Sequence, residues 1–204
     1  SCGARSKSRI TEDGGSTWPL VPAAALPPAQ PGEGAFAASG TCVETMGQRH
    51  AWIGTGAADT ARVLRTADGG RTWSASAVPV PGGGTKGLAA VAFRDTLHGT
   101  VLGGDVADPN SRMDNVAITE DGGRTWQRAT SQTFSGAVYG AVVIPGRPGW
   151  LLAAGPRGLD YSKDDGRSWA SLDTLAYWSV GFGSKDVGWA VGPKGRITRI
   201  VVSR

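Results

Sequence analysis

The chain has 204 residues, of which 40% are hydrophobic and 19% charged, so it can bury one ordinary globular core. Its 21 basic and 17 acidic residues give a net charge of +4, and no segment concentrates the basic residues, which argues against a nucleic-acid binder. Two cysteines and two histidines are too few for a thiolate zinc cage or a multi-histidine metal centre. No apolar run is long enough to cross a bilayer, so we expect no membrane insertion. We also expect no metal and no cofactor.

An eight-residue motif recurs four times and organises the whole chain. Each copy has a hydroxyl residue first, an aspartate third, a glycine fifth, a hydroxyl residue seventh and a tryptophan eighth. The copies span residues 11–18, 66–73, 119–126 and 162–169, and their tryptophans are 55, 53 and 43 residues apart. Four copies in a similar context indicate one structural unit repeated along the chain.

Short apolar segments surround the motif in a regular order and predict strands. Residues 8–21 predict the last two strands of a unit whose start is missing, and a proline-rich connection follows them. Three units of four strands come next, and in each the motif lies between the third and fourth strands. A last unit offers three strands and no motif. The expected strands are residues 36–43, 50–54 and 62–65, then 88–93, 98–103, 115–118 and 127–130, then 138–144, 149–152 and 159–161, and finally 178–182, 188–192 and 196–202.

Four short strands per unit, joined by glycine-rich turns, predict an all-β fold: a β-propeller of four-stranded antiparallel blades. We expect a single domain with five divisions. They are residues 1–34 (the end of a blade and a proline-rich connection), 35–80, 81–131 and 132–173 (three blades) and 174–204 (an incomplete blade). This amounts to about four blades, and the open edges of such an arc favour self-association.

The motif itself predicts a hairpin turn. Its aspartate can accept hydrogen bonds from backbone N–H groups further along the turn, its glycine allows a positive φ, and its tryptophan packs at the start of the outer strand. We expect a purely structural role, with a calcium or ligand site as the alternative, since an aspartate beside glycines also suits a cation loop. The residues concerned are Asp13, Gly15, Trp18, Asp68, Gly70, Trp73, Asp121, Gly123, Trp126, Asp164, Gly166 and Trp169.

This motif resembles the Asp-box, or bacterial neuraminidase repeat, of sialidases and sortilin-type propellers. The longer pattern, in which a Gly-Trp segment such as residues 149–150 precedes the motif, is closer to the photosystem II stability and assembly factor family. The resemblance covers nearly the whole chain and implies a propeller. Because these families have six or seven blades, it also implies a partial ring here. It favours an exported location, periplasmic or extracellular, although residues 1–7 do not read as a signal peptide.

A sialidase-like activity is not expected from the residues present. The resemblance would demand an arginine triad, a tyrosine nucleophile with a glutamate partner, and an acid/base aspartate. Tyr161 lies on a strand just before a motif, where burial is the expected role, and the arginine motif has no N-terminal counterpart. His50 and His98 occupy equivalent positions, which we interpret as hydrogen-bonded turn residues rather than general bases. We therefore expect no catalytic residue.

Propeller topology predicts two loop faces. The motif turns, with His50 and His98, share one face, and the loops between second and third strands lie on the other. On that second face the candidate partner-binding residues are Asp59, Arg62, Asp105, Arg112, Arg157 and Lys194. Basic groups in successive blades suit an acidic peptide or a carboxylate.

The sequence thus predicts a non-catalytic module for protein binding or complex assembly. The alternative is a glycan-binding or glycoside-hydrolase propeller. Cys2 and Cys42 pair only if the N-terminus folds back onto the first full unit.

Overall fold

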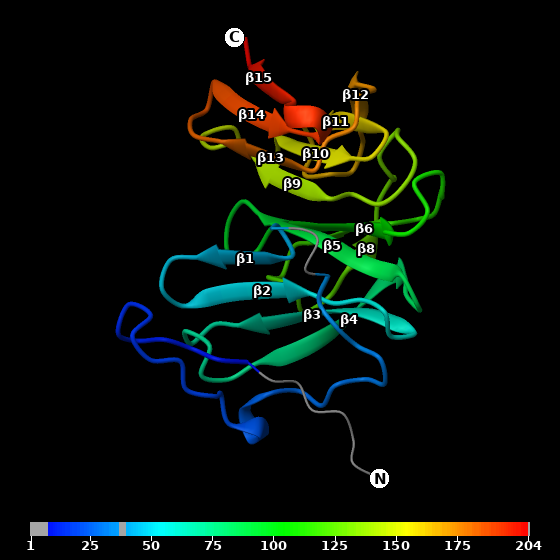
Figure 1. Ribbon diagram of the computed structural model, residues 1–204. Helices are drawn as coiled ribbons and strands as arrows, with labels where there is room; N and C mark the ends of the chain where they lie inside the picture. The colour runs from blue at the N-terminus through cyan, green and yellow to red at the C-terminus, as the bar shows by residue number, and fades with distance from the viewer. Residues whose placement is uncertain (1–7, 37–39, 204) are drawn as a thin grey trace.

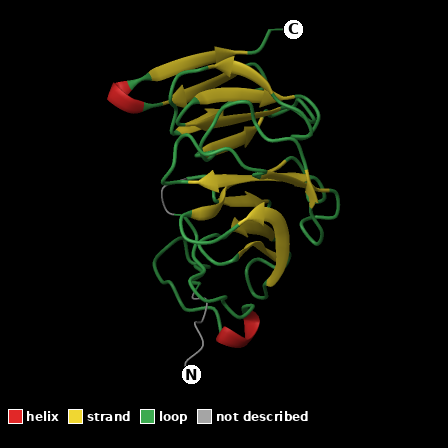
Figure 2. Ribbon diagram, turned by 90° about the vertical axis from the view of Figure 1, so that its right-hand side faces the viewer, coloured by secondary structure: helices red, strands yellow, loops and turns green. Residues whose placement is uncertain are grey.

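The computed structural model describes residues 8–36 and 40–203. Four antiparallel sheets follow one another along the chain and stack face to face (Figure 1). Helical structure among these residues is limited to two short 3-10 turns, η1 (Ala23–Ala25) and η2 (Pro193–Gly195) (Figure 2). No helix in this part of the chain is long and apolar enough to cross a membrane.

Three sheets have four strands and the last has three, and strands that are neighbours in sequence are also neighbours in each sheet. The first sheet contains β1 (Val43–Met46), β2 (His50–Gly54), β3 (Thr60–Thr66) and β4 (Ser74–Pro81). The second contains β5 (Lys86–Phe93), β6 (Gly99–Asp105), β7 (Val116–Thr119) and β8 (Gln127–Arg128). The third contains β9 (Gly140–Val143), β10 (Leu151–Gly155), β11 (Gly158–Ser162) and β12 (Ala170–Asp173). The last contains β13 (Ser179–Phe182), β14 (Val187–Val191) and β15 (Ile197–Val201).

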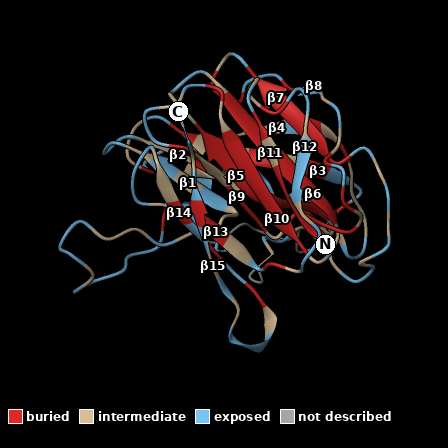
Figure 3. Ribbon diagram, turned by 90° about the horizontal axis from the view of Figure 1, so that it is seen from above, coloured by how far each residue is buried: buried red, intermediate tan, exposed pale blue. Residues whose placement is uncertain are grey.

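Apolar side chains fill the three spaces between successive sheets. Strands β5, β6 and β10 are buried along almost their whole length (Figure 3), because a neighbouring sheet covers each of their faces. This burial supplies the main stabilising term of the fold. The members include Trp52, Leu88 and Phe93 in the first space, Leu102, Val138 and Leu151 in the second, and Leu152, Leu159 and Tyr177 in the third.

The prediction for the first strand of the first sheet was wrong. It was expected at residues 36–43, but β1 spans Val43–Met46. The ring of Phe36 instead covers Gly56 and Gly87, where an added Cβ would lie 2.6 Å and 3.2 Å from the ring. The segment before β1 therefore serves a contact between the first and second sheets, which depends on glycines far away in the sequence.

Residues 8–21, here called the N-terminal hairpin, also depart from the expectation of two strands. They form a single bridge between Arg9 and Leu20, flanked by backbone hydrogen bonds from Ile10 N to Pro19 O (3.1 Å) and from Val21 N to Ser8 O (2.9 Å). Pro19 has no N–H to donate, and an isolated two-stranded pair is marginally stable in water. The pairing therefore stays short.

Among the described residues the sheets do not close into a ring. The N-terminal hairpin lies at one end of the molecule, and the last sheet lies at the other (Figure 1). The fold is a partial β-propeller, as predicted from the sequence. Cys2 lies outside the described residues, so the expectation about its pairing with Cys42 stays untested.

Trp52 offers a direct test of the packing between sheets. Its side chain is 1% exposed, and its ring stacks on Phe93 with centroids 3.8 Å apart. We predict that Trp52→Ala lowers the free energy of unfolding by about 3–5 kcal/mol, because it leaves a large cavity. Urea unfolding followed by circular dichroism measures this loss. Trp18→Ala, at a position 52% exposed, is the control and should cost much less. Equal losses would contradict the packing described.

Candidate functional site

The four motifs fold into closely similar hairpin turns, here called box turns. In the turn of residues 66–73, the Asp68 carboxylate accepts hydrogen bonds from the Thr72 N–H (2.9 Å) and from the Thr66 hydroxyl (2.8 Å). The Thr66 hydroxyl in turn accepts from the Gly70 N–H at 3.0 Å. The same contacts recur around Asp13, Asp121 and Asp164. The motif's hydroxyl and carboxylate positions are thus the donors and acceptors of one local network.

The box tryptophan closes the turn from its other end. The indole N–H of Trp73 donates to the Gly70 carbonyl at 2.9 Å, and Trp18 and Trp169 make the same bond. The third box turn differs. Trp126 donates to the Ser76 hydroxyl at 3.0 Å, and Ser76 donates to the Gly123 carbonyl at 2.7 Å. A hydroxyl from β4 of the first sheet is therefore inserted into the box turn of the second sheet.

Hydrogen bonding keeps the box carboxylates ionised. The hydroxyl and N–H of Thr72 lower the pKa of Asp68 from 3.8 to about 2, and Thr17 has the same effect on Asp13. At Asp121 burial acts in the opposite direction, yet the hydrogen bonds from Thr125 still bring the pKa to about 2. These oxygens are occupied by donors of their own turns. We therefore propose that the box turns are structural. Among the described residues, no three His, Cys, Asp or Glu side chains gather as a metal site.

Neighbouring box turns also contact one another, a feature the sequence reasoning missed. The second motif residue is glutamate in two copies, and the sixth residue of the following copy is arginine. Arg71 lies 3.2 Å from Glu12, and Arg167 pairs with Glu120. In the sequence, a glutamate at the second motif position of one copy is followed by an arginine at the sixth position of the next copy, and this pattern could have predicted the contact. Both pairs are exposed, so each adds little stability.

The structure brings two of the predicted partner-binding residues together. Residues 106–115 form the loop between β6 and β7. Arg112 in this loop donates to the Thr133 carbonyl at 3.1 Å, and Arg157 from the third sheet donates to the Asn110 side-chain oxygen at 2.9 Å. Both arginines are exposed. We call Asn110, Arg112 and Arg157 the arginine surface.

The other predicted residues do not join this surface. Arg62 forms an ion pair with Glu33, whose side chain is only 4% exposed, and donates to the Pro28 carbonyl at 2.9 Å. It therefore ties the proline-rich connection to β3 rather than facing a partner. Asp105 accepts from the Thr85 hydroxyl at 2.6 Å. Asp59 precedes β3 and Lys194 lies in η2, and both are exposed in loops of other sheets.

The two histidines lie at turns on the side of the box turns. The Nδ1 atom of His98 is 2.9 Å from the Asp95 carboxylate, which also accepts the N–H groups of Leu97 and His98 at 2.8 Å. His50 stacks near the Trp52 ring, with centroids 5.9 Å apart. Both contacts are those of residues that fix a local turn or packing.

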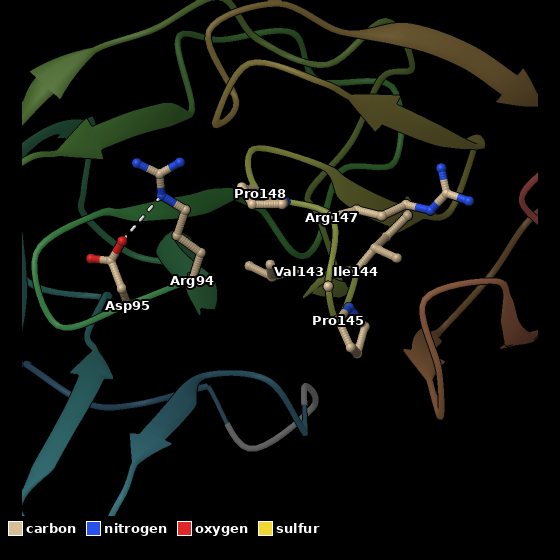
Figure 4. A pocket seen from close by; sticks show the side chains of 8 residues that line it. Arg94, Asp95, Val143, Ile144, Pro145, Arg147 and Pro148 are labelled. Carbon is tan, nitrogen blue, oxygen red and sulfur yellow. Dashed lines mark ion pairs between the residues drawn. The ribbon is translucent and has the colours of Figure 1, made fainter. Parts of the chain in front are cut away.

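A pocket of about 230 Å³ opens between the β5–β6 and β9–β10 turns (Figure 4). Arg94 beside it is paired with Asp95 (3.3 Å) and Asp165 (3.2 Å). Arg147 points away from Arg94 and pairs with Asp186 at 2.9 Å. The cations at this pocket are therefore already neutralised, so it is a weaker candidate for an anionic ligand than the arginine surface.

No protein-family model and no curated protein matches the sequence. Solved structures match its fold. YCF48 bound to D1 peptide has a TM-score of 0.57 at 18% identity, over 80% of this chain and 50% of that one. YCF48 from Cyanidioschyzon merolae has a TM-score of 0.58 at 14% identity, over 95% of this chain and 62% of that one. A GH74 xyloglucanase from Xanthomonas campestris has a TM-score of 0.62 at 20% identity, over 97% of this chain and 34% of that one.

At these identities the likeness shows the fold alone. The fold resembles the propellers of YCF48, a photosystem II assembly factor, and more broadly of GH74 enzymes, which confirms the predicted resemblance. The chain spans less than two thirds of the length of each of these structures.

The box carboxylates predict an acid-sensitive fold. Their pKa is 3.8 unfolded and about 2 folded for Asp13, Asp68 and Asp121, so their stabilisation is present above pH 3.8 and is lost as the pH falls towards 2. Thermal unfolding followed by circular dichroism across this range should show a falling midpoint. The double variant Asp68→Asn/Asp121→Asn should start from a lower midpoint at neutral pH and fall less steeply. Identical slopes for the two proteins would count against this role of the carboxylates.

Proposed function

We propose that this chain is a non-catalytic propeller module that binds an acidic protein segment at the arginine surface. The proposal rests on the type of hydrogen-bond partner that holds Arg112 and Arg157. Both donate hydrogen bonds to neutral oxygens, the Thr133 carbonyl and the Asn110 side chain. By contrast, Arg62, Arg94 and Arg147 are paired with carboxylates. Neither Arg112 nor Arg157 therefore forms an ion pair with a carboxylate of the described residues.

Anchoring also prepares the two guanidinium groups for binding. Each guanidinium group has five N–H donors. Only some of them bond within the protein, so others remain for a carboxylate. Because Thr133 and Asn110 hold the side chains in place, a partner would meet a surface already ordered, at a smaller entropic cost. The chemistry suits an acidic side chain or the carboxylate that ends a peptide.

The fold likeness supports a peptide as the partner. YCF48, which shares this fold, has been seen with a D1 peptide bound. On the sequence resemblance to the photosystem II stability and assembly factor family, we extend the proposal to a role in assembling a protein complex.

Two carboxylates close to the arginine surface do not supply the acid of a glycoside hydrolase. Glycoside hydrolysis uses two carboxyl groups, one of them an acid whose pKa is raised. Asp105 has a lowered pKa, because the Thr85 hydroxyl bonds to its charged form. Burial raises the pKa of Asp160, but this residue is 0% exposed and accepts the Thr133 hydroxyl at 3.0 Å. It cannot touch a substrate in this arrangement.

A glycoside-processing propeller is the second candidate, since the GH74 xyloglucanase matches 97% of this chain. Incubation with xyloglucan, followed by measurement of new reducing ends, distinguishes the two. We expect no turnover above a buffer blank. Turnover that scales with protein concentration would overturn the non-catalytic proposal.

The peptide proposal predicts charge-dependent binding. A fluorescent hexaglutamate peptide should bind with an anisotropy change that weakens as salt rises. Arg112→Glu and Arg157→Glu should each raise the dissociation constant at least about tenfold, since each replaces a charge-assisted contact with repulsion. Arg71→Glu is the matched control, because this exposed arginine lies at the box turns, and it should leave the constant unchanged.

Two results would contradict the assignment. Equal loss in all three variants would indicate a general charge effect without a specific surface. Unchanged binding in Arg112→Glu and Arg157→Glu would place the peptide elsewhere.

A further inference from the structure

In two of the three spaces between sheets, the tryptophan of a motif fills the part that lies next to the fourth strand. In the first space, Trp126 of the second sheet donates its indole N–H to the Ser76 hydroxyl of β4 at 3.0 Å. An added Cβ at Gly123 would lie 3.2 Å from the Trp126 ring and 3.3 Å from the Trp52 ring, so the two rings are neighbours. Trp169 of the third sheet packs against the apolar cluster of the second space.

The last sheet has neither such a tryptophan nor a fourth strand among the described residues. Gly188 of β14 pairs with Ile200 of β15, as Gly99 of β6 pairs with Thr119 of β7. Both glycines also pair with a phenylalanine of the first strand of their sheet. Thr119 is the first residue of its motif, so Ile200 holds the first motif position, and residues 201–203 contain no tryptophan. The third space therefore lacks the side chain that fills this part of the other two.

Strand register shows which residues of the third sheet would face such a tryptophan. Both β4 and β12 begin opposite the residue just before the motif, and their third residues are Ser76 and Leu172. From the other side, Trp52, Leu152 and Trp189 pair with the residue at this same point of the third strand. Leu172 and Leu152 are thus the counterparts, in the third sheet, of the two residues beside Trp126.

A pocket of about 520 Å³ lies against these two leucines. Trp150 and Tyr161 also line it from the third sheet, and Ile200 lines it from β15. Leu172 is 50% exposed. The pocket corresponds to the place that a tryptophan fills in the other two spaces, and its aromatic and apolar lining suits a side chain of the same kind.

The strand beside this pocket has a free edge. Among the described residues β15 pairs with β14 alone, at the end of the molecule (Figure 1). The Val202 N–H donates to the Asp186 carbonyl at 2.9 Å, and the Arg196 carbonyl accepts the Gly192 N–H at 3.0 Å. Even-numbered residues therefore direct their backbone groups to β14. Strand alternation directs those of the intervening residues to the free edge, namely Ile197, Arg199 and Val201. An edge of this kind can receive an extended segment through main-chain hydrogen bonds.

A lysine at the pocket supplies a charge. Lys163 is exposed, and its Nζ lies 4.4 Å from the centroid of the Trp150 ring and 5.6 Å from that of Tyr161. It forms no ion pair within residues 8–36 and 40–203, whereas Arg147 at the same pocket is paired with Asp186 at 2.9 Å. An acidic side chain carried in beside an aromatic one would therefore meet a cation.

We propose that the free edge of β15 and this pocket, together called the β15 groove, bind an extended segment of a partner protein. The segment becomes the fourth strand of the last sheet, places an aromatic side chain in the pocket and sets an acidic residue against Lys163. The β15 groove is separate from the arginine surface, since Arg157 precedes β11 and the pocket lies at the other end of that strand. The inference therefore does not depend on the function proposed above.

A fluorescent peptide of sequence Glu-Thr-Trp-Thr-Val-Thr tests the proposal by anisotropy. It should bind the unaltered protein, and a peptide with serine in place of tryptophan should bind at least about tenfold more weakly. Leu172→Arg, which obstructs the pocket, and Lys163→Glu, which reverses its charge, should each raise the dissociation constant at least about tenfold. Leu175→Arg is the matched control, because Leu175 is 46% exposed and lies outside the pocket, and it should leave the constant unchanged. Circular dichroism checks that each variant is folded.

Methylation of the peptide nitrogens tests the strand pairing separately. Methyl groups at alternate residues block one edge of an extended peptide, so one of the two alternate sets should abolish binding and the other should not. Binding that neither set weakens would overturn the proposal, as would unchanged binding in Leu172→Arg. Loss of binding in Arg157→Glu would place the peptide at the arginine surface instead. Self-association in sedimentation velocity that Leu172→Arg abolishes would assign the β15 groove to a second copy and would also overturn the proposal.

Discussion

The structure depends on a carboxylate that closes a turn from within. At Asp121 one side chain accepts the N–H groups of Arg124 and Thr125 and the hydroxyls of Thr119 and Thr125. This fixes the backbone of the turn, so that the Gly122 carbonyl faces the preceding sheet and receives Trp52. The interaction that finishes one sheet therefore also attaches it to its neighbour. Short strands such as β8 suffice, since the turn carries part of the interface.

In the proposed function, the polar groups on the two sides of the molecule have different roles. On the side of the box turns, the Asp121 carboxylate bonds within its own turn and Arg167 pairs with Glu120 of a neighbouring turn. On the opposite side, Arg112 is held by the Thr133 carbonyl and Arg157 by the side-chain oxygen of Asn110. We propose that an acidic partner recognises these two guanidinium groups, because neither of them forms an ion pair within the described residues.

Local chemistry decided what the sequence could predict. The box turns were recognisable because all their donors and acceptors lie within eight residues, and the order of strands followed from their repetition. Contacts between distant segments were not visible. Phe36 was expected in a strand but packs against Gly56 and Gly87, and Arg62 was assigned to a partner but pairs with Glu33. Trp52 and Trp189 look alike in sequence, and only strand register shows that they hold one position.

A double-mutant cycle between the box turn and the preceding sheet tests the central claim most directly. Trp52→Phe removes the indole N–H and Asp121→Ala releases the turn that presents the Gly122 carbonyl. Their effects on the free energy of unfolding should be coupled by about 1 kcal/mol or more, whereas Trp52→Phe and Asp164→Ala, in a box turn that receives Thr100, should add independently. Additivity of Trp52→Phe and Asp121→Ala within about 0.5 kcal/mol would show that the turn does not set the contact between sheets.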